Sequence, residues 1–133
     1  MEETEKIFIY INRELKKALS CYIVFHNLNI SDNKLDKKKF TENRFATLIL
    51  KAWVNSPSLK LDTLLFKGIK RGQNLNERMN LRIDKDTYMK LSQIYVEKYY
   101  RYCESLNFLV VNILDQWAIE NVETYRYFRK NEF

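Results

Sequence analysis

Glycine and proline are scarce in this chain, which has only two glycines and one proline among 133 residues. Their scarcity excludes collagen-like, linker-like and turn-dense all-β chains, because those classes need these residues at their repeats or turns. Glycine and proline are also the poorest helix formers, so a chain that avoids them is expected to be mostly helical. Apolar residues make up 46% of the sequence, which is enough for a core and excludes global disorder.

Side chains that bind metals or carry catalysis are equally few. The single histidine, His26, lies in an apolar and aromatic stretch with no cysteine or carboxylate at ligand spacing. The two cysteines, Cys21 and Cys103, are far apart and have apolar or aromatic neighbours, so we expect reduced thiols in a cytoplasmic protein. The glycine-bearing residues 67–72 lack the spacing of a phosphate-binding loop. We therefore expect no enzymatic activity, no metal and no other cofactor.

Long hydrophobic runs are missing as well. The apolar stretches at residues 48–50 and 108–111 are far too short to span a bilayer, so we expect no membrane partner. Residues 1–6 are acidic and polar, unlike a secretory signal or a transit peptide. The net charge is +6, with 23 basic and 17 acidic residues. This excess is modest, and it fits a nucleic-acid partner without proving one.

An internal repeat surrounds the two tryptophans of the chain. Residues 41–53 and 105–117 align at an offset of 64, and both read Ser or Thr, any residue, Asn, apolar residues and then Ile-Leu-x-x-Trp. The leading hydroxyl residue is typical of a helix N-cap, because its oxygen can accept a hydrogen bond from a free backbone N–H of the first turn. The isoleucine, leucine and tryptophan share one helix face. The repeat therefore predicts two capped helices.

A strand and a further helix are predicted upstream of each capped helix. Residues 6–11 favour β-structure and precede the helical pattern of residues 12–19. Residues 78–83 alternate polar and apolar side chains and precede the helical pattern of residues 84–91. These segments align at an offset of 72, so the first copy has extra residues. We place them in the polar run 31–39, either as a solvated loop or as a source of phosphate contacts.

We expect residues 1–133 to form a single compact domain that is built from two copies of this unit. The first copy covers residues 6–55 and the second covers residues 78–121, with a connector at 56–77 and a C-terminal helical extension at 122–133. A lone strand leaves its edges unpaired, so the strand of one copy must pair with that of the other. The predicted fold class is mainly α with a two-stranded antiparallel β-ribbon.

Two segments outside the copies have their own patterns. The middle of the connector, residues 59–67, is predicted to be helical. The aromatic residues of the C-terminal extension either cover the core or form a surface for a neighbouring chain or a partner protein. These residues are Tyr125, Tyr127, Phe128 and Phe133.

The second copy resembles the ribbon–helix–helix DNA-binding family, which includes the Arc and MetJ repressors. Residues 78–86, Arg-Met-Asn-Leu-Arg-Ile-Asp-Lys-Asp, look like the Arc ribbon and its turn into the first helix. Residues 105–107, Ser-Leu-Asn, are similar to the start of the family's second helix. Two copies in one chain resemble the TraY-like relaxosome accessory proteins. The resemblance implies a tandem ribbon–helix–helix fold that forms an intramolecular pseudo-dimer and binds double-stranded DNA.

The resemblance also implies which residues contact DNA. A two-stranded ribbon fits the major groove with alternate side chains toward the base edges. The base-reading residues would be Arg78, Asn80 and Arg82 of the second copy and Lys6, Phe8 and Tyr10 of the first. The start of each second helix would bind a phosphate through free N–H groups and its positive dipole end. These phosphate clamps would be Thr41, Glu42, Asn43, Ser105, Leu106 and Asn107.

Both strands leave an alternative open. The alternation at residues 78–83 also fits an ordinary strand with one solvated face. In residues 6–11 both faces are apolar, so periodicity does not fix the register, and the outward positions of Phe8 and Tyr10 rest on the repeat alignment. Phe8 and Tyr10 would alternatively meet another protein.

The resemblance implies a plasmid relaxosome accessory protein that acts at an origin of transfer and helps to position a relaxase. A transcriptional or copy-number repressor would use the same DNA chemistry. An antitoxin-like interaction protein would instead hold a partner with its aromatic C-terminus. Several chains are expected to associate on adjacent DNA sites.

Overall fold

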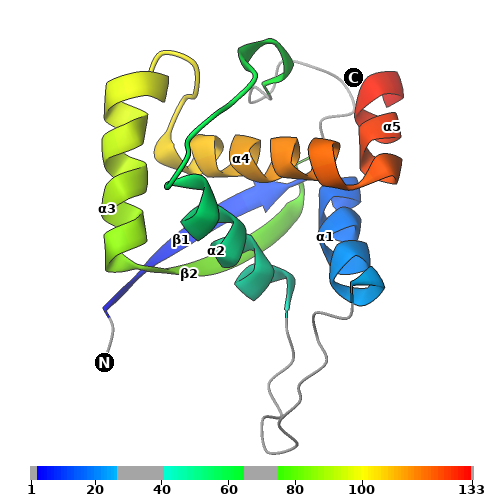
Figure 1. Ribbon diagram of the computed structural model, residues 1–133, viewed down its shortest axis with the longest axis horizontal. Helices are drawn as coiled ribbons and strands as arrows, with labels where there is room; N and C mark the ends of the chain where they lie inside the picture. The colour runs from blue at the N-terminus through cyan, green and yellow to red at the C-terminus, as the bar shows by residue number, and fades with distance from the viewer. Residues whose placement is uncertain (1–2, 27–40, 65–74, 133) are drawn as a thin grey trace, which may run out of the picture.

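The computed structural model describes residues 3–26, 41–64 and 75–132, which are mainly helical and contain one two-stranded sheet (Figure 1). This confirms a mainly α fold with an antiparallel ribbon. In chain order the elements are β1 (Thr4–Ile11), α1 (Arg13–Phe25), α2 (Glu42–Trp53), the 3-10 helix η1 (Leu61–Thr63), β2 (Glu77–Asp84), α3 (Lys85–Ile94), the π-helical turn η2 (Tyr95–Tyr99), α4 (Leu106–Asn121) and α5 (Glu123–Glu132).

The ribbon is formed by β1 and β2, which pair antiparallel along their full length. Ile7 lies opposite Leu81 and Ile9 lies opposite Met79, and all four side chains are buried. Successive side chains of a strand point to opposite faces, so the alternate set in each strand faces away from the core. The isoleucines of β1 therefore point inward, as the repeat alignment predicts.

Helices α2 and α4 cover the buried face of the ribbon, and each packs mainly on the strand of the other half of the chain. Helix α2 follows β1 in the sequence but packs on β2, whereas α4 follows β2 but packs on β1. In Figure 1 both helices cross the ribbon, with α1 near one end and α3 near the other. The two halves are thus interleaved around one core.

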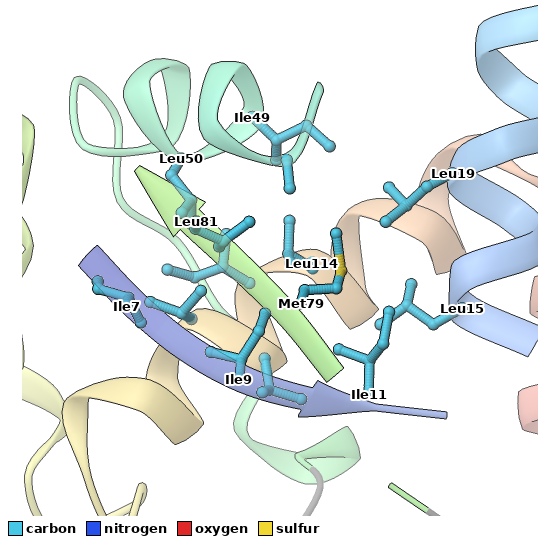
Figure 2. Close-up of a cluster of buried hydrophobic side chains, with 14 of the residues drawn as sticks. Ile7, Ile9, Ile11, Leu15, Leu19, Ile49, Leu50, Met79, Leu81 and Leu114 are labelled. Carbon is cyan, nitrogen blue, oxygen red and sulfur yellow. The ribbon is translucent and has the colours of Figure 1, made fainter. Parts of the chain in front are cut away.

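The core contains the apolar residues that define the repeat. Figure 2 shows Ile49 and Leu50 of α2 and Leu114 of α4 directed toward the inward side chains of the ribbon, with Leu15 and Leu19 of α1 beside them. All five side chains are buried. Full burial of such a side chain stabilises a fold by about 1.5–3 kcal/mol.

The helices predicted from the repeat each begin with a capping side chain. The caps of α1, α2, α3 and α4 are Asn12, Thr41, Asp84 and Ser105. The carboxylate of Asp84 accepts hydrogen bonds from the backbone N–H of Thr87 at 3.0 Å and from its hydroxyl at 2.8 Å. The hydroxyl bond is the largest factor that lowers the pKa of Asp84. Asp84 therefore joins the end of β2 to the start of α3 in a charge-dependent way.

The connector does not form the helix that was predicted for residues 59–67, as far as these residues are described. Within the described part of residues 59–67, only Leu61–Thr63 is helical, as a single 3-10 turn. The side chain of Gln116 accepts a hydrogen bond from the N–H of Lys60 at 2.7 Å and donates one to its carbonyl at 2.6 Å. Because this side chain satisfies the backbone of Lys60, a helical turn is not needed there. Residues 65–67 and the polar run 31–39 lie outside the described residues.

The residues after 121 are helical, but they form a separate helix instead of extending α4. Val122 has an extended backbone, with φ −126° and ψ 107°, and α5 begins after it. The guanidinium of Arg126 donates to the carbonyls of Ile119 and Glu120, at 2.7 and 3.0 Å. These bonds satisfy carbonyls at the end of α4, which allows the chain to turn.

The aromatic residues of α5 have different environments. Tyr125 is buried and Phe128 is partly buried against the core, as expected for core-covering residues. Tyr127 is 71% exposed and is available to a partner. Phe133 lies outside the described residues.

A buried polar cluster attaches α5 to the rest of the molecule. Asp115 of α4 is fully buried and accepts hydrogen bonds from two guanidinium nitrogens of Arg129, both at 2.9 Å. The hydroxyl of Tyr125 also donates to Asp115 and accepts a hydrogen bond from the amide of Asn12 at 3.0 Å. Burial raises the pKa of Tyr125, which keeps its hydroxyl protonated. Arg129 also donates to the carbonyl of Thr63, so the cluster joins α1, η1, α4 and α5.

We predict that Arg129→Ala lowers the free energy of unfolding by about 3–5 kcal/mol, because it leaves the Asp115 carboxylate buried without its cation. Urea denaturation followed by far-UV circular dichroism measures this change. The matched control is Lys130→Ala, which removes the same charge from the next, exposed position and should cost less than about 0.5 kcal/mol. Equal effects of the two variants would contradict a stabilising role of the cluster.

We predict that Asp84→Ala lowers the free energy of unfolding by about 0.5–2 kcal/mol through loss of the α3 cap. The pKa of Asp84 is lower in the folded state than the usual value of an aspartate side chain, so the contribution of its charge is fully present above that usual value. It is lost as the pH falls through the lower folded pKa. Asp84→Asn keeps a capping oxygen without this titration. Thus the difference in the free energy of unfolding between wild type and Asp84→Asn should shrink on acidification from pH about 5 to about 2. A difference that stays constant over this range would refute a charge-dependent cap at Asp84.

Candidate nucleic-acid interface

The six side chains expected to read bases lie together on the outward face of the ribbon. Register pairs them across the strands as Lys6 with Arg82, Phe8 with Asn80 and Tyr10 with Arg78. All six are exposed, including the rings of Phe8 and Tyr10 at 44% and 51%. We call this set of six residues the ribbon face.

The ribbon face carries groups that can recognise base edges. Two arginines and one lysine supply cations, one asparagine supplies an amide, and the two aromatic residues supply apolar surface. A guanidinium can bind the O6 and N7 atoms of guanine, an asparagine amide can bind the N6 and N7 atoms of adenine, and apolar groups can contact the methyl of thymine. No carboxylate belongs to these six residues, so the face is positively charged.

One cation of the ribbon face is held against a ring. The guanidinium carbon of Arg78 lies 4.7 Å from the centre of the Phe8 ring. The two residues are diagonal neighbours on adjacent strands, since Phe8 is paired with Asn80 and Arg78 with Tyr10. A cation over an aromatic face is attracted by the negative charge of the π-system. Arg78 and Phe8 therefore act as one unit on this surface.

The start of α2 borders the half of the ribbon face that contains Asn80 and Arg82. A shallow depression of about 320 Å³ is lined by Asn43, Arg44, Thr47, Asn80 and Arg82. It combines two guanidinium groups with the positive end of a helix dipole, which favours an anion such as a phosphate. The hydroxyl of Thr41 accepts a hydrogen bond from the N–H of Arg44, at 3.2 Å, and so serves as the cap.

The start of α4 is chemically different. Ser105 caps the helix, and the amide nitrogen of Asn107 donates a hydrogen bond to the carbonyl of Phe8 at 2.8 Å. The repeat aligns Phe108 with Arg44, so this helix start lacks the cation of its counterpart, and the acidic Glu104 precedes it. The expected clamp residues Ser105, Leu106 and Asn107 thus lie beside β1, in less basic surroundings than the start of α2.

Arg44 and Thr47 were not singled out by the sequence. Arg44 could have been predicted as a phosphate-binding residue, because it is basic, lies in the first turn of a capped helix and directly follows Asn43 of the expected clamp. The position of Arg44 and Thr47 beside Asn80 and Arg82 could not be predicted from the sequence, because α2 packs on β2, the strand that is remote in sequence.

A second concavity lies on the helical side of the molecule. It has a volume of about 500 Å³ between α1, α2, α4 and the connector, and both tryptophans line it. The indole N–H of Trp53 donates to the carbonyl of Ser58 at 3.0 Å, and Gln116 is bonded to Lys60. Since these polar groups are already satisfied, the concavity is mainly an apolar surface.

Histidine, cysteine and acidic side chains are the groups that could hold a metal ion. In the part of the chain that the structure describes, no cluster of three or more of these side chains is placed to do so. Cys21 is exposed and Cys103 is buried, and both are free thiols. Burial raises the pKa of Cys103 to about 11, so its thiol stays protonated near neutral pH. None of the helices in the described ranges has the length and apolar character needed to cross a membrane.

The ribbon face and the start of α2 form the candidate site, and its assignment rests on this geometry and on the repeat. Comparisons with protein-family models, with curated proteins and with solved structures found no match to this chain.

Proposed function

We propose that this chain is a non-enzymatic, cofactor-independent protein that binds double-stranded DNA sequence-specifically through its ribbon face. The observation that carries the proposal is the placement of six base-compatible side chains on one exposed face, directly above a buried isoleucine-rich face. Paired strands lie about 4.8 Å apart, and the major groove of B-DNA is about 12 Å wide. The backbone of a two-stranded ribbon is therefore narrow enough to fit the groove.

The register supports an intramolecular pseudo-dimer of two ribbon–helix–helix copies. The repeat offset of 72 makes Phe8 and Asn80 counterparts, and these two residues lie directly opposite each other. The same offset relates Lys6 to Arg78 and Tyr10 to Arg82, so a pseudo-twofold axis would pass through the central pair. The reciprocal packing of α2 on β2 and of α4 on β1 agrees with that axis.

The basic depression at the start of α2 supplies a phosphate contact beside the ribbon face. Phosphate contacts position a protein on DNA, whereas contacts with base edges give specificity. We expect non-specific Kd values of about 10⁻⁴ to 10⁻⁶ M and specific binding that is tighter by several powers of ten, both weakening with salt.

The biological role is proposed from the resemblance to TraY-like proteins. It is that of a relaxosome accessory protein at a plasmid origin of transfer, where it would help to position a relaxase. A transcriptional or copy-number repressor is the alternative with the same DNA chemistry. Sites beside a relaxase nick would support the first role, and sites in a promoter would support the second.

An antitoxin-like interaction protein is a further candidate, favoured by the exposed ring of Tyr127 on α5. Deletion of residues 122–133 would be a poor test, because Tyr125 is buried and bonded to Asp115. Tyr127→Ala removes only the exposed ring. Loss of partner capture with unchanged DNA binding would favour this candidate.

We predict that Asn80→Ala and Arg82→Ala each weaken specific binding by about 5- to 150-fold, which corresponds to about 1–3 kcal/mol for one base contact. The cognate site is first obtained by selection from random duplex DNA, and Kd is then measured by fluorescence anisotropy at one salt concentration. Lys98→Ala is the charge control for Arg82→Ala, since it removes an exposed cation from η2. Wild-type affinity in both ribbon variants, with the fold intact, would overturn the ribbon assignment.

We also predict that the selected element is short and non-palindromic, because the two strands present unlike side chains on the ribbon face. Several chains should then align on direct repeats of that element. Footprinting on the source replicon measures this arrangement. A strict palindrome bound by a dimer of chains would rule out the pseudo-dimer as the reading unit.

A further inference from the structure

The cation–π pair of Arg78 and Phe8 links the two strands diagonally. Phe8 lies opposite Asn80, and Arg78 is paired with Tyr10, so the guanidinium reaches one pair along the ribbon to lie 4.7 Å from the ring centre. Diagonal neighbours of a sheet are within reach of aromatic and long side chains. Among the described residues, no carboxylate forms an ion pair with Arg78, so the ring is the partner that orients it.

The backbone that carries the Phe8 ring is held on both sides. Its neighbours Ile7 and Ile9 are buried, with 3% and 1% exposure. Its carbonyl accepts the 2.8 Å hydrogen bond from the amide of Asn107 at the start of α4. An edge carbonyl is thereby satisfied by a helix that packs on the same strand. The ring is thus an exposed platform on a fixed segment.

The other half of the ribbon face has no such platform. The repeat offset of 72 relates Phe8 to Asn80 and Arg78 to Lys6. The diagonal pair that corresponds to Arg78 and Phe8 is therefore Lys6 and Asn80, a cation beside an amide. A lysine ammonium is a mobile point charge, whereas a guanidinium is a planar fork that stacks on rings. The two halves therefore differ in how firmly they hold their cation.

We propose that Phe8 is a positioning residue that orients the Arg78 guanidinium for guanine, so that the ribbon face reads its site in one orientation. This inference rests on the proposed DNA binding. A guanidinium stacked on a ring keeps the N–H groups at its edge free, and those groups bind the O6 and N7 atoms of guanine. Phe8 then contributes to specificity through Arg78, and Lys6 contributes charge with less selectivity.

The stacking itself is tested in the absence of DNA. The ring current of Phe8 should shift the side-chain proton resonances of Arg78 upfield in the free protein. Phe8→Leu should abolish the shift and lower the melting temperature by only a few degrees, because an exposed cation–π contact is worth about 0.5–1 kcal/mol and Phe8 is 44% exposed. Phe8→Tyr keeps the ring and should keep the shift. An Arg78 spectrum that is unaffected by Phe8→Leu overturns the positioning role, whatever the chain binds.

The consequence for recognition is tested by selection from random duplex DNA with wild type, Phe8→Leu, Arg78→Ala and the double variant. Both single variants should lose base preference at the same base pair, with Kd raised about fivefold or more for the cognate site. The double variant should bind within about twofold of Arg78→Ala, since coupled residues do not add. Phe8→Tyr should retain the preference.

Two results would overturn the inference, and they are distinguishable. If Phe8→Leu leaves the preference at the base pair read by Arg78 unchanged, or if the two single effects multiply, Phe8 does not act through Arg78. If the wild-type chain selects no sequence at all, the proposed function fails and the recognition part of the inference fails with it, even where the ring-current shift shows the stacked pair.

Discussion

The pairing of β1 with β2 is the contact on which the rest of the structure depends. The two strands, Thr4–Ile11 and Glu77–Asp84, are far apart in the chain, and neither can satisfy its backbone edges alone. Their pairing creates one apolar face, which must be covered. Helices α2 and α4 cover it by packing on the strand of the opposite half. One constraint therefore accounts for the interleaving of the two halves, for the single core and for the exposed ribbon face.

The polar cluster around Asp115 connects the helical layer to that ribbon. Asn12, which bonds to Tyr125, follows Ile11 directly at the end of β1 and also caps α1. The cluster thus ties the position of α5 to the point where the ribbon joins its first helix. Buried charges cost free energy unless they are paired and hydrogen-bonded, and Arg129 meets both requirements for Asp115. The cluster therefore fixes the helical layer at the end of β1, where α1 begins.

Asymmetry is the main functional property of the proposed interface. The sequence repeat gives the two halves of the chain matching helix caps and core residues, but the residues at repeat-related surface positions differ. Arg44 stands at the start of α2 where Phe108 stands in α4, and Phe8 lies opposite Asn80 on the ribbon. Unlike side chains at repeat-related positions would suit the proposed reading of a DNA element in one direction. The excess of basic residues is spread over both halves of the chain and the connector, so the net charge alone does not locate the site.

The sequence by itself determined the strands, the caps and the face of each strand, because these depend on local hydrogen bonding and on residue spacing. The helix caps Asn12, Thr41, Asp84 and Ser105 were predictable for that reason. The register of β1 needed the repeat as well, since both of its faces are apolar. Only the tertiary structure decided that α4 ends before Val122, that Arg44 lies beside Arg82, and that the Arg78 guanidinium lies over the Phe8 ring. The last two depend on how residues distant in sequence approach one another, and spacing along the chain carries no signal for that approach. The end of α4 depends on the bonds from Arg126 to the carbonyls of Ile119 and Glu120, which no cap residue or glycine in the sequence announces.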